Sequence, residues 1–242
     1  MVSVAPLIWL QSQPLQPGEQ LFAVLCNASA AEPFRAFRSC SDSLPNPIWA
    51  DTAYAEWEPV MPYVVAVEPG SAFLDWVAQT PVSDWGWLAV SRAPLAAMVD
   101  QLRGLTQVLL PNGQATFFRF WDGRFLLPTL QSEHVDAAQL LPLVDRCLIN
   151  GQSLHIDGQA LACSQKFPWW PVPVALLKSF AVADSATRVS NLLKWLSEER
   201  PDVYELFSEP VVRCKLKHFL HDLSLPDAPK KQCVDYMLAE RR

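Results

Sequence analysis

The sequence is short of glycine, and this shortage limits the kinds of active site that it can form. It has eight glycines among 242 residues. The phosphate-binding loops G-x-x-x-x-G-K-[S/T] and G-x-G-x-x-G are absent, as are the G-x-S-x-G turn of serine hydrolases and the H-E-x-x-H motif of zinc proteases. We therefore predict no catalytic set, and we expect a protein that is not an enzyme and that uses no cofactor or metal.

Lysine is missing from most of the chain. Residues 1–165 contain seven arginines, no lysine and fifteen acidic side chains, a net charge of −8, whereas residues 166–242 carry twelve basic and ten acidic side chains. The whole chain has a net charge of −6, which disfavours phosphate backbones because their binding depends on clustered Lys and Arg. We expect no nucleic-acid partner, and we predict two lobes, residues 1–165 and residues 166–242.

Long apolar runs and paired cysteines are missing as well. Apolar stretches such as Val64 to Val67 are far shorter than the roughly 20 residues of a membrane span. The first residues carry no Lys or Arg and are too few for a signal peptide. The six cysteines are scattered without a C-x-x-C pair, as in reduced intracellular proteins. These features predict a cytoplasmic protein that does not contact a membrane.

Half of the residues are apolar, which is enough for a sizeable core. Short runs rich in β-branched or aromatic residues predict five strands, at residues 21–26, 63–67, 85–91, 105–110 and 115–121. Helical spacing recurs between them, at residues 30–38, 70–79 and 94–103. The pattern predicts an α/β (α+β) fold in which a mixed β-sheet is packed against flanking helices.

Turn residues predict how some strands are joined. The Asn112-Gly113 pair lies between two apolar runs, and Asn-Gly favours the positive φ angles of a type I′ turn. We therefore expect a hairpin of strands 105–111 and 114–121. The Asp157-Gly158 pair predicts a second, weaker hairpin over residues 154–163.

The C-terminal lobe is predicted to be helical. Ser185 is expected to cap a helix over residues 185–199, and residues 210–223 place their apolar side chains on one face. Asp227 is expected to cap a last helix. The preceding segment FPWWPVPVALL contains three prolines and predicts a rigid connector.

Two other groups of residues allow different functions. Cys214, His218 and His221 lie at i, i+4 and i+7 of one predicted helix, a spacing that can point three ligands at one ion. A polar outer face explains the same pattern, and we assign no metal. The alternative function is a small cytosolic hydrolase or transferase that uses His134, His155 or a cysteine in a pocket between the lobes.

The stretch FFRFWDGRF, residues 117–125, places two arginines and an aspartate among aromatic rings. On a strand that is covered on both faces, the stem of Arg119 is buried and its guanidinium needs a carboxylate or carbonyl partner. Asp122 is expected to cap the following helix or to pair with Arg119 or Arg124. The segment is therefore predicted to be a structural brace.

The same segment resembles a known family. The order of a helix, LAAMVDQLRGL, a strand, a P-N-G turn and FFRFWDGRFLLPTL is similar to the signature of the type VI secretion effector chaperones, or adaptors, of the Tap or TEC kind. That signature reads L-P-D-G, R-F-Y-D-P-R and L-P-T-L. The similarity covers approximately residues 20–145, with Gly123 in place of the proline of D-P-R. The matching residues are Pro111, Gly113, Arg119, Phe120, Asp122, Arg124, Leu127, Pro128, Thr129 and Leu130.

The resemblance implies a non-enzymatic function in bacterial toxin delivery. Such a protein binds one toxic type VI effector in the cytoplasm of the producing cell and helps to load it onto the VgrG spike protein or its PAAR tip. The family motif residues Arg119, Asp122 and Arg124 are then structural or contribute to docking. The resemblance ends before the second lobe, for which we predict a role in cargo specificity.

The connector supplies candidate partner-binding residues of its own. Trp169 and Trp170 lie next to prolines, where neither ring is easily placed in a regular core, and Trp is enriched at the centres of protein interfaces. Burial of the connector between the lobes is the alternative for both rings. A scaffold subunit of another complex remains a third interpretation of the whole chain.

Overall fold

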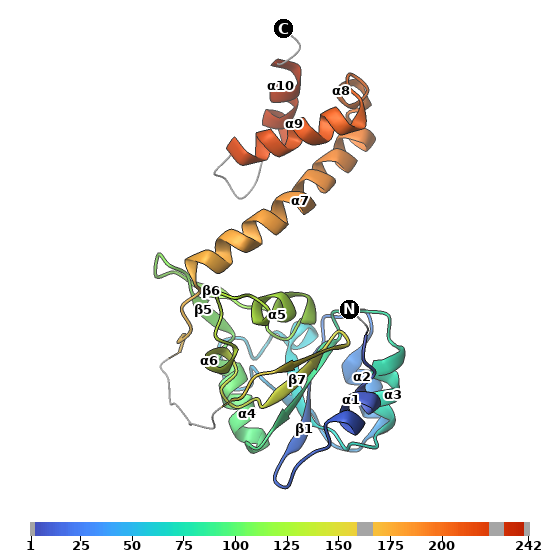
Figure 1. Cartoon of the computed structure of the whole chain (residues 1–242), viewed down its shortest axis with the longest axis vertical. Helices are drawn as coiled ribbons and strands as arrows, with labels where there is room; N and C mark the ends of the chain where they lie inside the picture. The colour runs from blue at the N-terminus through green and yellow to red at the C-terminus, as the bar shows by residue number, and fades with distance from the viewer. Residues whose placement is uncertain (1–2, 159–166, 223–229, 240–242) are drawn as a thin grey trace. The chain divides into compact units, whose positions relative to one another are not determined.

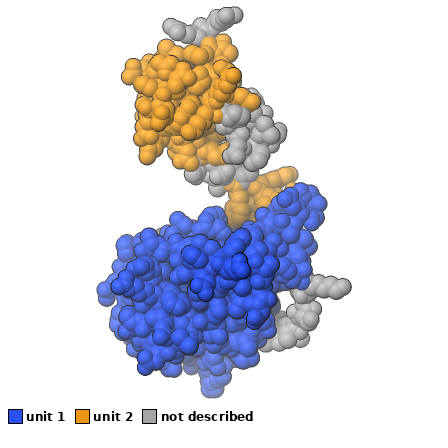
Figure 2. Space-filling view, turned by 180° about the vertical axis from the view of Figure 1, so that it is seen from behind, with its two compact units in different colours: residues 1–173 blue, residues 174–242 orange. Residues whose placement is uncertain are grey.

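Two units make up the chain, residues 1–173 and residues 174–242 (Figure 1 and Figure 2). The computed structural model describes residues 3–158, 167–222 and 230–239. The boundary predicted at Lys166 lies outside the described residues, and the division between the units falls after Pro173.

A six-stranded sheet forms the centre of the first unit, with the strand order β2-β3-β1-β4-β7-β8. All of its pairings are antiparallel. The strands are β1 (Gln20–Cys26), β2 (Asn46–Pro47), β3 (Pro62–Ala66), β4 (Gly86–Ser91), β7 (Arg146–Ile149) and β8 (Gln152–His155). The predicted α+β class is therefore confirmed.

The central strands are apolar over most of their length because both faces of the sheet are covered. In β1, Val24 pairs with Val64 on one side and with Trp87 on the other, and all three side chains are fully buried. A strand that is buried on both faces cannot alternate polar and apolar residues. This explains why LFAVLC reads as one continuous apolar run.

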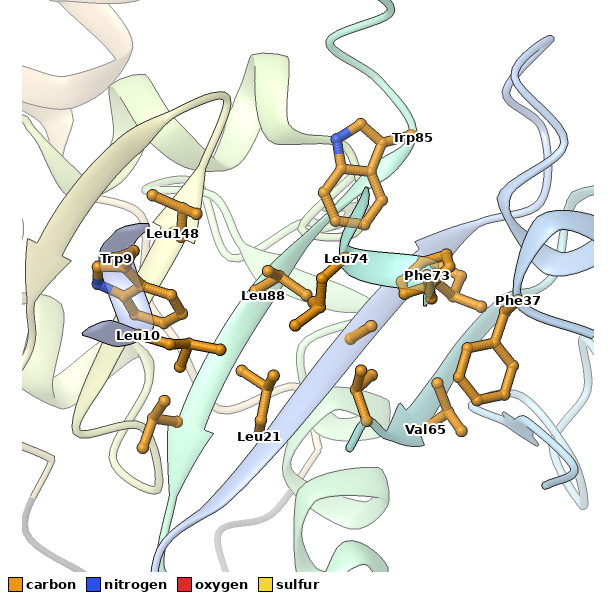
Figure 3. Packing of buried hydrophobic residues seen from close by; sticks show 14 residues of the cluster. Trp9, Leu10, Leu21, Phe37, Val65, Phe73, Leu74, Trp85, Leu88 and Leu148 are labelled. Carbon is orange, nitrogen blue, oxygen red and sulfur yellow. The ribbon is translucent and has the colours of Figure 1, made fainter. Parts of the chain in front are cut away.

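One face of the sheet packs against three helices, α1 (Pro6–Ser12), α2 (Pro33–Cys40) and α3 (Ala72–Gln79). Figure 3 shows side chains from these helices pointing toward alternate residues of the strands. The fully or nearly fully buried members of this core include Trp9, Leu21, Phe37, Phe73, Leu74 and Leu88.

The opposite face is covered by α4 (Leu95–Gly104), α5 (Gly123–Leu130) and the short α6 (Ala137–Leu140) (Figure 1). Met98 and Leu102 of α4 and Leu126 of α5 are fully buried. The indole Nε1 of Trp87 donates to the carbonyl of Phe120 at 2.9 Å. This bond ties the sheet to the segment that leads into α5.

The Asn112-Gly113 hairpin is confirmed, but it is shorter than predicted and forms a sheet of its own. It consists of β5 (Gln107–Leu109) and β6 (Ala115–Phe117). Only Gly113 of the pair has a positive φ, +80°, while the Asn112 side chain accepts from the Gln114 N–H at 3.0 Å. The turn is therefore not type I′, and the prediction that all five strands share one sheet is wrong.

The second predicted hairpin falls partly outside the described residues, and a different hairpin, of β7 and β8, precedes it. Strand β8 pairs with the preceding strand β7 and ends at His155. Residues 159–163 lie outside the described residues. The connecting turn is Asn150-Gly151, whose φ angles of +49° and +73° are those of a type I′ turn. The sequence analysis did not predict a turn at this pair.

The second unit is helical, as predicted, with its own apolar core. It contains α7 (Val174–Glu199), α8 (Pro201–Tyr204), α9 (Glu209–Asp222) and α10 (Lys230–Ala239). Fully or almost fully buried side chains from all four helices pack together: Val189, Leu196, Val203, Val212, Leu216, Cys233 and Met237.

Two details of the predicted helices change. Ser185 lies inside α7 and does not begin a helix, and the predicted cap Asp227 lies outside the described residues. The part of the chain that the structure describes has no helix with the length and apolar content needed to cross a bilayer.

Candidate functional site

The FFRFWDGRF segment places one buried carboxylate between two guanidinium groups at the start of α5. Asp122 is fully buried, and its Oδ2 lies 2.9 Å from Arg119 Nη2 and 2.8 Å from Arg124 Nη2. Its Oδ1 accepts from Nε and from the backbone N–H of Arg124, both at 3.0 Å. The hydrogen bond to Asp122 raises the pKa of Arg124, so this guanidinium is held in its charged form.

Local sequence places the aspartate there. Asp122 has an extended backbone and is the N-cap of α5, a position that favours a short acceptor side chain. Gly123 then begins the helix, and a Cβ atom at this residue would lie 2.9 Å from Cγ2 of Ile149. Glycine therefore allows α5 to start against the end of β7. Both roles predicted for Asp122, helix cap and ion-pair partner, occur together.

Two further residues extend the cluster across the ends of the central strands β1 and β4. Arg124 Nη2 lies 3.0 Å from Asp84 Oδ2, and Asp84 Oδ1 accepts from the Ser29 hydroxyl at 2.6 Å. Ser29 follows β1 and Asp84 precedes β4, and the end of one antiparallel strand adjoins the start of the next. The sequence analysis identified neither residue, although Asp84 directly precedes a predicted strand.

The two arginines of the cluster and the neighbouring Phe125 are exposed to solvent. The side chains of Arg119 and Arg124 are 46% and 48% exposed, and Phe125 is 44% exposed. The guanidinium carbon of Arg119 lies 4.7 Å from the centre of the Phe125 ring, which is a cation–π contact. We name Arg119, Arg124 and Phe125 the arginine surface.

The exposure of Arg119 corrects one expectation. Strand β6 ends at Phe117, and the chain then turns, with the Asp122 N–H donating to the carbonyl of Arg119 at 3.1 Å. Because the strand stops two residues before Arg119, the stem of this arginine is not enclosed between two covered faces. The buried member of the brace is Asp122.

The two connector tryptophans differ from each other. Trp170 is 6% exposed, and its ring centre lies 5.8 Å from that of Phe118. The Leu109 N–H donates to the Trp170 carbonyl at 2.9 Å, and the Val172 N–H donates to the Leu109 carbonyl at 2.8 Å. The connector thus pairs with β5, and Trp170 is a core residue of the first unit. Trp169 is half-buried beside Gly104, and the role of the two rings in partner binding stays a prediction.

The cysteines of the first unit's sheet are not activated. Burial raises the pKa of Cys147 to about 12. Burial, with the negative charge of Asp122, raises the pKa of Cys26 to about 11. A catalytic cysteine needs a lowered pKa, because the thiolate is the nucleophile. Both thiols are therefore protonated near neutral pH.

The histidines of the alternative function form surface contacts. His155 Nε2 lies 2.8 Å from Asp157, and His134 Nε2 lies 3.8 Å from the adjacent Glu133. All four side chains are more than one-third exposed. The contacts are those of surface pairs, which neighbouring residues form readily.

The Cys214, His218 and His221 group is only partly described. His218 Nδ1 lies 3.0 Å from the backbone carbonyl oxygen of Cys214 and 3.8 Å from its sulfur. The side chain of His221 lies outside the described part of the structure. Among the described side chains, no three His, Cys, Asp or Glu residues are grouped as metal ligands.

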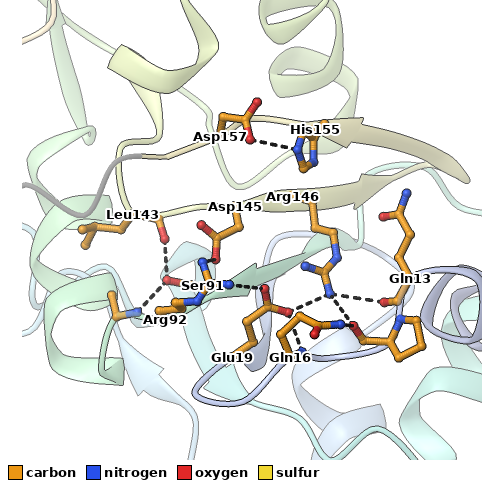
Figure 4. A network of polar contacts seen from close by, with 12 residues as sticks. Gln13, Gln16, Glu19, Ser91, Arg92, Leu143, Asp145, Arg146, His155 and Asp157 are labelled. Atoms are coloured by element: carbon orange, nitrogen blue, oxygen red, sulfur yellow. Dashed lines mark hydrogen bonds and ion pairs between the residues drawn. The ribbon is translucent and has the colours of Figure 1, made fainter.

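A second polar network lies at the opposite end of β1 (Figure 4). Arg146 of β7 pairs with Glu19 at 2.9 Å, and both side chains are at least nine-tenths buried. Arg92 contacts Glu19 at 3.1 Å and Asp145 at 3.6 Å. Burial alone would raise the pKa of Glu19, but the hydrogen bond from Arg146 and the charges of both arginines lower it overall. We interpret this network as a brace between β7 and the loop before β1.

The arginine surface is best suited to protein recognition. Its guanidinium groups are held in place by Asp122 and Asp84, yet each keeps donors that can reach a carboxylate or carbonyl of a partner. Phe125 adds an apolar contact beside them. Arginine and aromatic residues dominate the binding energy of protein interfaces. The geometry therefore favours a docking surface.

Comparison with known proteins adds one finding. Residues 21–140 match the model of a family described as "Domain of unknown function (DUF4123)". No curated protein and no solved structure matches the chain significantly. The matched range runs from β1 to α6 and includes the whole arginine surface. A segment of the first unit is thus similar to the DUF4123 family over residues 21–140.

Proposed function

We propose that this protein is a non-catalytic chaperone or adaptor of the type VI secretion system. In this proposal it binds a toxic effector in the cytoplasm of the producing cell and helps to load it onto the VgrG spike protein or its PAAR tip. The similarity of FFRFWDGRFLLPTL to the adaptor signature supports the proposal, and this segment lies inside the DUF4123 match.

The observation that carries the proposal is the exposed half of the family motif. A motif needed only for folding would be expected to bury its charged groups in mutual pairs. Here the pairing carboxylate is buried while Arg119 and Arg124 are nearly half exposed, beside an exposed Phe125. Interfaces bind through such anchored arginine and aromatic side chains. The arginine surface is the proposed contact for the effector.

The second unit is proposed to contribute cargo specificity. It has a separate apolar core, a different balance of charge, and no part in the DUF4123 match. Removing residues 174–242 is expected to abolish binding of the cognate effector while leaving the first unit folded. Full binding by the shortened, folded protein would show that specificity resides in the first unit.

The direct test is co-expression with a candidate type VI effector, followed by size-exclusion chromatography. Arg119→Ala and Phe125→Ala are each expected to weaken the complex by about tenfold or more. Arg35→Ala is the matched control, because Arg35 is 81% exposed and forms an ordinary surface pair with Glu32. Unchanged affinity in both test variants, with normal thermal stability, would remove the arginine surface from the interface.

A further inference from the structure

A second exposed cluster joins the connection between β2 and β3 to Phe117, the first residue of FFRFWDGRF. Trp57 is 47% exposed and Phe117, at the end of β6, is 39% exposed. Their rings are stacked, with centres 5.7 Å apart and an interplanar angle of 20°. Tyr54 lies against both rings at 5.2 and 4.9 Å. We name Tyr54, Trp57 and Phe117 the aromatic patch.

The buried ring of Trp49 holds the aromatic patch rigidly. Trp49 is 2% exposed, and its Nε1 donates to Oγ1 of Thr106 at 3.0 Å. The Trp49 ring contacts Trp57 at 6.1 Å and Phe117 at 6.3 Å, both edge to face. Because the rings are fixed before a partner arrives, little side-chain entropy is lost on binding.

The connection that carries Tyr54 and Trp57 is acidic, and its charges are not neutralised by ion pairs within the described part of the chain. Asp51, Glu56 and Glu58 flank Trp57 in the sequence and are exposed. None of the three forms a salt bridge within the described part of the chain. Residues 39–91 contain no Lys, Arg or His at all. Arg103, which donates to the carbonyl of Ile48, and Arg119, two residues after Phe117, are each paired with an aspartate.

These two properties select one class of ligand. Exposed aromatic faces attract apolar side chains and also cations, through the cation–π interaction. Unpaired carboxylates attract Lys and Arg and repel phosphate groups, which disfavours nucleic acids and anionic lipid surfaces. A basic peptide segment with an apolar anchor satisfies both features together.

We propose that the aromatic patch docks a basic segment of a partner protein. An apolar side chain of that segment packs on the rings of Trp57 and Phe117, while its Lys or Arg side chains lie over Asp51, Glu56 and Glu58. This inference stands on the patch itself. It holds or fails independently of whether the arginine surface binds a type VI effector.

A fluorescein-labelled peptide of alternating lysine and leucine, titrated into the full-length protein, tests the proposal by fluorescence anisotropy. Trp57→Ala is expected to weaken binding by about tenfold, and the double variant Glu56→Gln/Glu58→Gln by about fivefold. Binding should weaken further in 0.5 M salt, because exposed charges are screened. A peptide with glutamate in place of lysine should not bind.

Two controls separate the patch from general acidity. Glu68→Gln/Asp75→Gln removes the same charge from exposed positions elsewhere and should change affinity by less than about twofold. In protein labelled with 5-fluorotryptophan, the ¹⁹F signal that is lost in Trp57→Phe should shift when the peptide is added. Circular dichroism confirms that each variant is folded.

Three results would overturn the proposal. The first is no binding of the lysine-leucine peptide to the wild-type protein. The second is equal weakening by the test and control double variants, or unchanged affinity in folded Trp57→Ala. The third is a concentration-dependent self-association, seen in sedimentation, that Trp57→Ala abolishes, because the patch would then bind a second copy of this chain.

Discussion

At the scale of single residues, the carboxylate of Asp122 joins two arginines to the N-terminus of a helix. Its complete burial is offset by donors on both oxygens. A buried acceptor with charged donors contributes more than a surface pair, because its partners cannot be replaced by water. The same residue therefore supports the fold and sets the direction of the guanidinium groups.

Asp122→Ala is expected to lower the free energy of unfolding by about 3 kcal/mol. About 1 kcal/mol comes from the lost cap and about 2 kcal/mol from the hydrogen bonds to charged donors. Arg119→Ala should cost about 1 kcal/mol or less, because its guanidinium is half exposed and screened by solvent. Urea unfolding measures both values. Equal losses in the two variants would make Arg119 the brace.

Buried thiols predict a loss of stability at alkaline pH. The folded protein raises the pKa of Cys26 and Cys233 from 9.0 to about 11 and that of Cys147 to about 12. Above pH 9 the unfolded chain releases these protons while the folded chain retains them, so ionisation favours unfolding. The stabilisation is complete below pH 9 and is lost as the pH rises toward 11.

Each thiol should contribute a slope of roughly 1.4 kcal/mol per pH unit in this window. Urea unfolding between pH 7 and pH 10 measures the slope. Cys147→Ala should make it shallower above pH 9 and leave it unchanged below pH 8. The same alkaline slope in wild type and Cys147→Ala would contradict the assignment.

The sequence predicted the partners of Asp122 but not which member of the cluster is buried. An aspartate before a helical pattern is a cap signal, and nearby arginines are its natural partners. The exposure of Arg119 depends on β6 ending at Phe117, and the aromatic run FFRFW continues past that point without a turn signal. Strand ends of this kind are set by tertiary packing, here by the bond from Trp87 to the Phe120 carbonyl.

At the scale of elements, the two Asn-Gly turns differ in what surrounds their glycines. Gly113 and Gly151 have φ angles of +80° and +73°, which an L-residue adopts at a cost. No atom lies within 4 Å of an added Cβ at Gly113, whereas a Cβ at Gly151 would overlap Ser3. The Gly151 carbonyl also accepts from the Val4 N–H at 2.8 Å, so this turn anchors the N-terminal segment.

Gly113→Ala is therefore expected to cost about 1 kcal/mol, the strain of the left-handed backbone alone. Gly151→Ala should cost about 2–3 kcal/mol, because Ser3 must also move. Urea unfolding compares the two variants. Restoration of stability by Ser3→Gly in the Gly151→Ala background would identify the overlap as the cause, and no restoration would exclude it.

Elements with strong patterns were predictable, and short polar ones were not. The apolar runs of β1 and β4 and the spacing of α4 indicated their type and place. Strands β7 and β8 were not predicted, because RCLI and QSLH mix polar and apolar residues over only four positions each. The intervening Asn150-Gly151 pair carried the same turn signal as Asn112-Gly113, so this hairpin could have been read from the sequence.

At the scale of the whole molecule, the connector determines where the first unit ends. Residues 170–172 pair with β5, and Trp170 is buried against Phe118. The change in charge near Lys166 marks a difference in composition, but the backbone pairing extends the first unit to Pro173. Composition could not reveal this, because a proline-rich segment has no strand pattern.

A fragment of residues 1–173 is therefore expected to be more stable than one of residues 1–165 by about 3–5 kcal/mol. The shorter fragment loses the burial of Trp170, about 3 kcal/mol, and two backbone hydrogen bonds. Urea unfolding of the two fragments measures the difference. A fragment 1–173 carrying Trp170→Ala should fall close to the shorter one, and equal stability of all three would separate the connector from the fold.

The absence of lysine from residues 1–165 decides how the interfaces of this protein can be mapped. Reagents that cross-link primary amines have no side chain to react with on either the arginine surface or the aromatic patch. They would report contacts mainly from the second unit and would assign any partner to it. Cross-linkers that react with carboxylates would report contacts from both units, because residues 1–165 carry fifteen acidic side chains.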